Sequence, residues 1–199
     1  MPKKLSDNGI SKNLEETLIV VGLRIAKRGE GALFIVGKVE KSDYRKLIDQ
    51  KVPPFKVTKN PKLLESLALI DGAVIIDREG FLQAYGVMIK STKTLKNYGT
   101  RHSAGLTASK KGNFVLVISE EDRKLRILRE GKMVMQIDAL QKDVEKSVHG
   151  AIDMLESVGA GTIGTIGAGM LAPTLGIALL PGIVVFGSAY YLAKLLGRK

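Results

Sequence analysis

The stretch Gly31-Ala32-Leu33-Phe34-Ile35-Val36-Gly37 decides the fold class of this 199-residue chain. It is a short, continuous apolar run with a glycine at each end. Such a run is typical of a β-strand that is buried on both faces, because a strand with one solvated face alternates apolar and polar residues. Residues 73–77 and 113–119 are apolar runs of the same kind. We therefore predict three central strands.

Helices are predicted on both sides of the first run. Residues 14–26 have the spacing of an amphipathic helix, with Asn13 as its N-cap. A weaker helix is predicted over residues 42–51, before Pro53 and Pro54. Another short helix is predicted over residues 61–69, where Pro61 suits the first turn. The apolar stripe of the first helix consists of Leu14, Leu18, Val21 and Ile25.

The middle of the chain contains further strands. Residues 81–89 follow a turn at residues 78–80, so we expect them to pair antiparallel with the strand at residues 73–77. A helix is predicted to begin within residues 101–109. A hairpin at the edge of the sheet is predicted from residues 125–128 and 133–137. The mixture of strands and helices indicates an α/β or an α+β protein, and periodicity alone does not choose between the two.

The C-terminal part is predicted to be helical and then to enter a membrane. Apolar residues follow a helical period over residues 138–156, and this amphipathic helix would connect the soluble domain, residues 1–137, to the tail. Residues 157–193 contain no Asp, Glu, Lys, Arg or His. A bilayer core needs about 20 residues per helix, so this length suits one tilted span or two short spans. We therefore predict that residues 157–199 form a membrane anchor.

The number of spans depends on the flanking charges. Cytoplasmic flanks of membrane segments are enriched in Lys and Arg. A single span would carry Lys194, Arg198 and Lys199 across the membrane, whereas a hairpin would keep them on the cytoplasmic side. We therefore favour a C-terminal apolar helical hairpin, at the cell membrane, with the soluble domain in the cytoplasm. The alternative is a helical pair that is buried within a soluble oligomer.

The net charge of +11 indicates that the binding partners of the chain are anionic. Three positive charges follow the uncharged tail, which leaves +8 for residues 1–156. A basic domain suits nucleic acid, a nucleotide polyphosphate or an anionic membrane surface. The sequence has no tryptophan and no clustered arginine with interleaved aromatic residues, which disfavours nucleic acid. The absence of cysteine excludes disulfides and thiolate metal sites.

The stretch Gly99-Thr100-Arg101-His102 contains candidate ligand-binding residues. Its three side chains supply a hydroxyl, a fork of fixed donors and a titratable imidazole, which together suit phosphate. Upstream of it, Asp71-Gly72-Ala73 leads into a buried strand, and its carboxylate could hold the metal ion that accompanies a nucleotide. These two segments predict a site for nucleotide phosphates.

Four segments together resemble the diadenylate cyclase domain, which is shared with the N-terminal part of the DNA-integrity scanning protein. They are residues 31–36, 71–76, 99–102 and 117–121, in this order, and the resemblance covers roughly residues 14–137. It implies an α/β fold with a mixed, twisted sheet flanked by helices. It also implies that two ATP molecules condense into cyclic di-AMP and release two pyrophosphates. Each subunit of a homodimer or higher homo-oligomer would hold one ATP and face its partner.

The resemblance also implies roles for individual residues. Asp71, Arg101 and His102 match the catalytic positions of the family, and Asp71 would also bind Mg²⁺ or Mn²⁺ and polarise the attacking hydroxyl. Glu121 is the second predicted metal ligand, with Glu120 as the alternative. The nucleotide-binding positions implied in this way are Gly72, Ala73, Thr100, Ser103, Ser119 and Glu120.

Ser103 departs from the family pattern, which has Arg-His-Arg where this chain has Arg101-His102-Ser103. A serine supplies no charge, and the loss of one charge-assisted hydrogen bond costs about 1.5–3 kcal/mol. Lys110 or Lys111 is a candidate to replace that charge. Two alternatives to an active cyclase therefore stay open. One is a degenerate domain that binds ATP or cyclic di-AMP as a sensor without turnover, and the other is a structural membrane protein whose basic domain docks on anionic lipid.

Overall fold

A computed structural model of the chain describes residues 9–90, 99–159, 177–180 and 182–186. Its helices are α1 (Lys12–Lys27), α2 (Pro61–Ala68), α3 (Thr100–Ser109) and α4 (Val148–Gly159), with short 3₁₀ turns η1 (Lys41–Asp43), η2 (Val57–Lys59) and η3 (Val144–Ser147). Its strands are β1 (Ala32–Val36), β2 (Tyr44–Lys46), β3 (Ala73–Ile76), β4 (Leu82–Ile89), β5 (Phe114–Ile118), β6 (Lys124–Arg129), β7 (Lys132–Asp138), β8 (Ile177–Leu180) and β9 (Ile183–Phe186).

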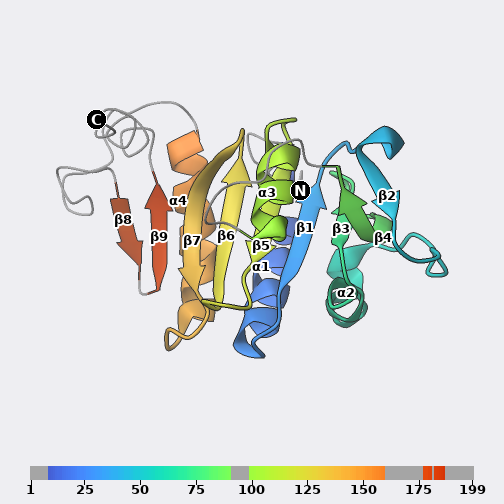
Figure 1. Ribbon diagram of the computed structural model, residues 1–199. Coiled ribbons are helices and arrows are strands. Elements are labelled where there is room, and N and C mark those ends of the chain that lie inside the picture. The colour runs from blue at the N-terminus through green and yellow to red at the C-terminus, as the bar shows by residue number, and fades with distance from the viewer. Residues whose placement is uncertain (1–8, 91–98, 160–176, 181, 187–199) are drawn as a thin grey trace.

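The strands form one mixed sheet in the order β2-β4-β3-β1-β5-β6-β7-β9-β8 (Figure 1). Strands β1 and β3 are parallel, and the other neighbouring pairs are antiparallel. The three apolar runs of the sequence are β1, β3 and β5, which lie side by side and are buried along their whole length. The predicted mixed sheet with helices on its faces is therefore confirmed.

Alternate residues of β1 face two separate hydrophobic cores. Phe34 and Val36 belong to the larger core, to which α1, α2 and α4 contribute. Leu33 and Ile35 belong to the smaller core, which α3 covers. Figure 1 shows α3 over one face of the sheet and α1, α2 and α4 over the other. Because both faces are covered, the continuous apolar runs are explained by the two layers of helices.

Helix α1 matches the predicted apolar stripe but begins earlier than expected. Ser11, and not Asn13, is the N-cap residue, and its hydroxyl accepts a hydrogen bond from the Leu14 backbone N–H at 3.3 Å. All four predicted stripe residues are 1% exposed or less: Leu14, Leu18, Val21 and Ile25. The stripe therefore packs against the sheet as the spacing indicates.

Two predictions in the middle of the chain are wrong in part. Residues 42–51 form no α-helix, and η1 and the short strand β2 occupy the first part of this segment. Strand β2 pairs with residues 87–89 of β4, a distant partner that local periodicity does not reveal. The hairpin β6–β7 is present, but it does not lie at the sheet edge, because β9 pairs with β7.

The predicted helix over residues 138–156 is correct only in its second half. Strand β7 extends to Asp138, whose side chain accepts a hydrogen bond from the Leu140 backbone N–H at 2.9 Å and so begins a turn. Leu140 is 62% exposed instead of lying on an apolar stripe. Val148 and Ile152 of α4 are buried in the larger core. The helix is therefore packed on the sheet domain, and the predicted boundary at residue 137 stays a prediction.

Beyond the end of α4 at Gly159, the described strands of the predicted helical hairpin are β8 and β9, and no described helix lies there. Strands β8 and β9 pair antiparallel, and β9 joins the sheet through Met135–Val185 and its neighbouring pairs. Residues 183–186 are Ile-Val-Val-Phe, which are residue types that favour strands. Within the described ranges, no helix has both the length and the apolar character needed to cross a membrane. Residues 160–176, 181 and 187–199 of the predicted anchor lie outside these ranges.

Candidate functional site

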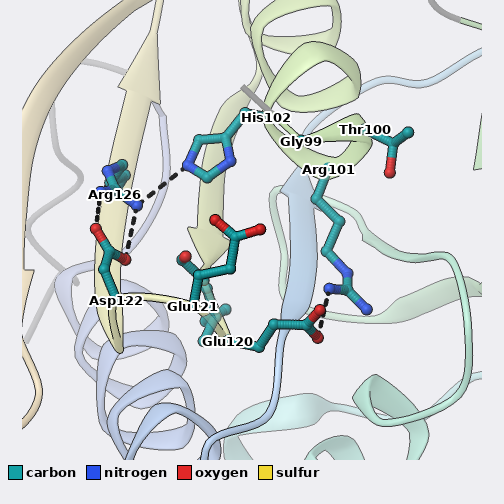
Figure 2. Close-up of a pocket in the computed structure, with 10 residues that line it drawn as sticks. Gly99, Thr100, Arg101, His102, Glu120, Glu121, Asp122 and Arg126 are labelled. Carbon is teal, nitrogen blue, oxygen red and sulfur yellow. Dashed lines mark hydrogen bonds and ion pairs between the residues drawn. The ribbon is translucent and has the colours of Figure 1, made fainter. Parts of the chain in front are cut away.

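The first turn of α3 and the residues after β5 form the candidate site. Gly99 is the N-cap residue of α3, so Thr100, Arg101 and His102 occupy the first turn. Strand β5 ends at Ile118, and residues 119–122 follow it. Helix α3 packs on β1 and β5, which brings these two segments together (Figure 2). The backbone N–H groups at a helix N-terminus favour anions, so this end of α3 suits a phosphate.

Two neighbouring cavities open at this place. The first, here named the His102 cavity, has a volume of about 390 Å³. It is lined by Gly99, Thr100, Arg101, His102, Ile118, Ser119, Glu120, Glu121, Asp122 and Arg126. Its polar side chains come from α3, from the turn after β5 and from β6, and Figure 2 shows several of them pointing toward one another.

The second cavity, here named the Asp71 cavity, has a volume of about 430 Å³. It is lined by Leu33, Leu47, Asp71, Gly72, Ala73, Val87, Met88, Ile89, Thr100, Arg101, Ala104 and Glu120. This lining contains more apolar side chains than that of the His102 cavity, alongside the polar Asp71, Thr100, Arg101 and Glu120. Thr100, Arg101 and Glu120 line both cavities. One elongated ligand with an apolar part and a charged part could therefore extend from one cavity into the other.

An ion pair stands where the two cavities meet. Arg101 Nη1 lies 3.0 Å from Glu120 Oε2, and the side chains are 35% and 54% exposed. Ion pairs with this exposure contribute little to stability. The guanidinium of Arg101 is therefore held beside both cavities by a contact that a ligand can replace at small cost.

A second charged cluster lines the His102 cavity on the side away from Arg101. Arg126 of β6 forms an ion pair with Asp122, and its Nη1 atom also lies 3.2 Å from His102 Nε2 (Figure 2). Because a guanidinium nitrogen only donates, His102 Nε2 must accept this hydrogen bond, so a neutral His102 carries its proton on Nδ1. The imidazole is therefore oriented by Arg126.

The cluster shifts the pKa of two of its members. Burial lowers the pKa of His102 below its ordinary value, and the positive charge of Arg126 lowers it further. Burial acts to raise the pKa of Asp122, but hydrogen bonds from Arg126 and Ser119 outweigh it, and the net pKa lies below the ordinary value. At neutral pH the cluster therefore holds a neutral imidazole beside a charged Arg126–Asp122 pair.

Gly72 allows a close approach of two backbone segments. Its φ is +107°, and a Cβ atom at this position would lie 2.7 Å from both the backbone N and the backbone O of Val87. The family resemblance implies that Gly72 lets a nucleotide approach the backbone. The structure adds that the segment leading into β3 rests directly on β4, so Gly72 also sets the position of Asp71.

The structure brings most of the predicted site residues to the two cavities. Asp71, Gly72 and Ala73 line the Asp71 cavity, and His102, Ser119 and Glu121 line the His102 cavity. The two predicted metal ligands, Asp71 and Glu121, thus line different cavities, whereas Glu120 shares the Asp71 cavity with Asp71. Within the described residues, no group of three or more His, Cys, Asp or Glu side chains is arranged for a metal ion. Asp71 and Glu120 fit a metal that takes its remaining ligands from substrate phosphates and water.

Ser103 and the two candidate lysines do not take part in the described cavities. Ser103 is 2% exposed and lines neither of them. Lys111 Nζ lies 2.6 Å from Asp43, and Lys111 follows the C-terminal end of α3, whereas His102 is in its first turn. The aliphatic part of Lys110 lies close to Gly131. The lysines therefore do not supply the charge that Ser103 lacks.

Asp122 and Arg126 are the site residues that the sequence motifs do not indicate. Arg126 lies between Leu125 and Ile127, which are both fully buried in the larger core. A charged residue between two buried ones on a strand faces the opposite side of the sheet, where α3 lies. That alternation is visible in the sequence, but the pairing of Val117 with Arg126, which places Arg126 beside β5, is not.

Comparison with known proteins identifies the family. Residues 22–133 match the family model DAC, described as DisA bacterial checkpoint controller nucleotide-binding. A diadenylate cyclase of Haloferax volcanii is 30% identical over 151 residues, which cover 67% of this chain and 54% of that protein. The chain thus spans about half the length of this curated relative.

Two solved structures are also similar. One is a hypothetical membrane spanning protein from Bacillus cereus, with 23% identity, a TM-score of 0.48, and coverage of 60% of this chain and 61% of that one. The other is a double mutant of DacA from Staphylococcus aureus, with 22% identity, a TM-score of 0.46, and coverage of 60% and 83%. The family assignment rests on the match over residues 22–133, which is more than half of the chain: it belongs to the DAC family of nucleotide-binding domains.

Proposed function

We propose that this protein is a diadenylate cyclase, a nucleotidyltransferase that condenses two ATP molecules into cyclic di-AMP and releases two pyrophosphates. The observation that carries the proposal is the position of Arg101 at the N-terminus of α3, where it borders both the Asp71 cavity, which has the more apolar side chains, and the His102 cavity. An adenine base suits the apolar side chains of the first cavity, and a triphosphate suits the donors of the second. Membership of the DAC family supports the same assignment.

In this reaction the 3′-hydroxyl oxygen of each ribose attacks the α-phosphorus of the other ATP. A new oxygen–phosphorus bond forms, the bond from the α-phosphorus to the bridging oxygen breaks, pyrophosphate leaves with the electron pair, and the proton of the 3′-hydroxyl is released to water. Arg101 and the first turn of α3 would bind the phosphate oxygens on which negative charge develops. A neutral His102 would donate a hydrogen bond from Nδ1, because Nε2 already accepts one from Arg126.

Asp71 and Glu120 would hold a divalent metal ion, Mg²⁺ or Mn²⁺, together with the phosphates. Such an ion neutralises phosphate charge and favours ionisation of a hydroxyl bound to it. Asp71 is exposed at the Asp71 cavity, so its carboxylate can reach a ligand there. Glu120 is paired with Arg101 and would exchange this partner for the metal when the phosphates take its place at Arg101.

The reaction needs two copies of the chain, because each ATP supplies the nucleophile for the other. We propose a face-to-face homodimer, in which the cavities of two subunits meet. Effective catalysis then depends on assembly, since neither subunit alone places a 3′-hydroxyl in line with an α-phosphate. The initial rate should therefore rise more steeply than linearly with protein concentration until the dimer is fully formed.

The test is incubation of the full chain with ATP and Mn²⁺ over a series of protein concentrations, with chromatographic detection of cyclic di-AMP and pyrophosphate. We expect both products in a ratio of one to two and a steeper-than-linear dependence at low concentration. A folded chain that binds ATP but forms no cyclic di-AMP at any concentration would contradict the cyclase and favour a nucleotide sensor.

The lack of charge over residues 157–193 supports a further proposal, association with a membrane. Residues 177–180 and 183–186 form the strands β8 and β9 and so are not part of a helical hairpin. The proposal therefore concerns association with a membrane and not the number of spans. Ultracentrifugation of cell lysate with and without detergent tests it. The full chain should sediment with membranes unless detergent is present, and recovery in the supernatant without detergent would contradict this proposal.

A further inference from the structure

We propose that Arg126 is a second phosphate-binding residue of the site, and that it exchanges its carboxylate partner Asp122 for the triphosphate of the nucleotide. The inference rests on the proposed function and deepens it, because it assigns a residue to the recognition of the triphosphate. Arg126 comes from β6, outside the sequence segments that indicate the nucleotide site.

The position of Arg126 follows from the register of the sheet. Its two strand neighbours are fully buried in the larger core, so its side chain projects from the opposite face of β6, where α3 packs. Val117 of β5 is its partner across the ladder. The side chain of Arg126 therefore enters the His102 cavity from the face of the sheet that α3 covers. Figure 2 shows it facing His102.

The guanidinium of Arg126 has donors to spare. Its contacts are two hydrogen bonds to Asp122 and one to His102 Nε2. A guanidinium has five N–H groups, so a ligand oxygen in the cavity can be bound even before any partner is given up. The side chain of Arg126 is only 14% exposed, which strengthens its attraction for an anion relative to a fully solvated arginine.

A phosphate can replace the Asp122 carboxylate as the partner of the Arg126 guanidinium. Its carboxylate binds the guanidinium through two oxygens, the same geometry that a phosphate offers. Asp122 is 36% exposed, so it can turn toward water when a triphosphate arrives. The triphosphate carries more negative charge than one carboxylate, which favours the exchange.

Arg126 and Arg101 then bind phosphate from two sides. Figure 2 shows the two guanidinium groups on opposite sides of the cavity, with Glu121 between them. The position next to His102 holds the buried Ser103, which contributes no charge. Arg126, which belongs to β6, thus supplies the cavity with a second guanidinium in addition to that of Arg101.

The test measures binding of ATP and of adenosine to the full chain by calorimetry. Arg126→Ala should weaken ATP binding about ten- to hundredfold, because a charge-assisted contact to phosphate is lost. Adenosine binding should change less than about threefold, since adenosine has no phosphate. Arg126→Lys should recover part of the ATP affinity, and Asp122→Asn should raise it, because the carboxylate charge that competes with the phosphate for Arg126 is removed.

The matched control is Arg28→Ala. Arg28 is also an arginine that is ion-paired with a carboxylate, Glu65, at 2.7 Å, but it lies outside both cavities. The Arg28→Ala variant should bind ATP as the wild-type chain does. Circular dichroism checks that each variant is folded, and Arg126→Gln serves if Arg126→Ala does not fold.

The outcomes separate this inference from the proposed function. Unchanged ATP affinity in folded Arg126 variants would overturn the inference while the cyclase proposal stands. Equal losses for ATP and adenosine would also overturn it, because they would assign Arg126 a structural role. If the wild-type chain itself fails to bind ATP, the proposed function is contradicted as well.

Discussion

Arg101 Nη1 lies 3.0 Å from Glu120 Oε2, and this ion pair joins the first turn of α3 to the turn after β5 at the meeting point of two cavities. Its half-exposed setting matters for function. A pair of this kind adds little to the free energy of unfolding, so it can open when a nucleotide arrives. The charges are thus arranged for a ligand more than for stability.

Arg101→Ala should separate function from stability. We expect ATP binding to weaken about ten- to hundredfold, because a charge-assisted hydrogen bond to phosphate is lost. The free energy of unfolding should change by no more than about 1 kcal/mol, because the pair with Glu120 is solvated. Calorimetry and urea unfolding measure the two effects, with Arg28→Ala as the control for loss of an exposed ion pair. Normal ATP affinity in Arg101→Ala would contradict the assignment.

Gly72→Ala should lower the stability of the protein, because Gly72 lies in a tightly packed turn at the Asp71 cavity. The φ of +107° and the 2.7 Å approach to the Val87 backbone leave no room for a Cβ atom, so we expect a loss of about 1–3 kcal/mol in the free energy of unfolding. Gly99→Ala is the comparison, because no atom lies within 4 Å of its Cβ position and its φ is −63°. There the loss should be at most about 1 kcal/mol, from the weaker N-cap. Similar losses at both glycines would contradict the close approach.

Ser103→Arg should not raise the proposed formation of cyclic di-AMP. Although the family pattern has an arginine here, Ser103 is 2% exposed on the packed side of α3. A large charged side chain at this place would cost about 1–3 kcal/mol through overpacking alone. We expect a lower midpoint of thermal unfolding and no gain in cyclic di-AMP formation, whereas Ser103→Ala should change stability by about 1 kcal/mol or less. Higher product formation with unchanged stability would show that the site accepts the arginine.

The two histidines should have opposite effects on the pH dependence of stability. Burial and Arg126 lower the pKa of His102 in the native state. Between its ordinary pKa of 6.5 and that lowered value, the unfolded chain binds more protons at this position than the native chain. The contribution of His102 to stability is therefore lost as the pH falls below 6.5.

His149 has the opposite sign. A hydrogen bond to Glu16, together with the charge of Asp153, raises its pKa in the native state. Its contribution is present below the ordinary pKa and is lost as the pH rises through the raised value. Urea unfolding between about pH 5 and pH 8 should show a shallower acid-side decline for His102→Gln and a steeper one for His149→Gln. Identical pH profiles for the wild type and both variants would contradict these assignments.

Local patterns in the sequence determined the central strands, the apolar stripe of α1 and the strand pair β3–β4. Each depends on the spacing of neighbouring residues or on one turn, so the necessary information is contiguous. The same holds for Thr100, Arg101 and His102, which occupy one helical turn because they are adjacent in the chain. The proposal that this turn binds phosphate therefore rests on the sequence alone.

Only the tertiary structure decided which distant side chains share a cavity. Asp71 lines the same cavity as Glu120 and a different cavity from Glu121, where α3 packs on β1 and β5. Arg126 enters the site through the register of β5 and β6. Residues 183–186 are strand because β7 offers a backbone edge that satisfies their hydrogen bonds. Such pairings depend on contacts between remote segments, and an apolar run is compatible with either a helix or a strand until its partner is known.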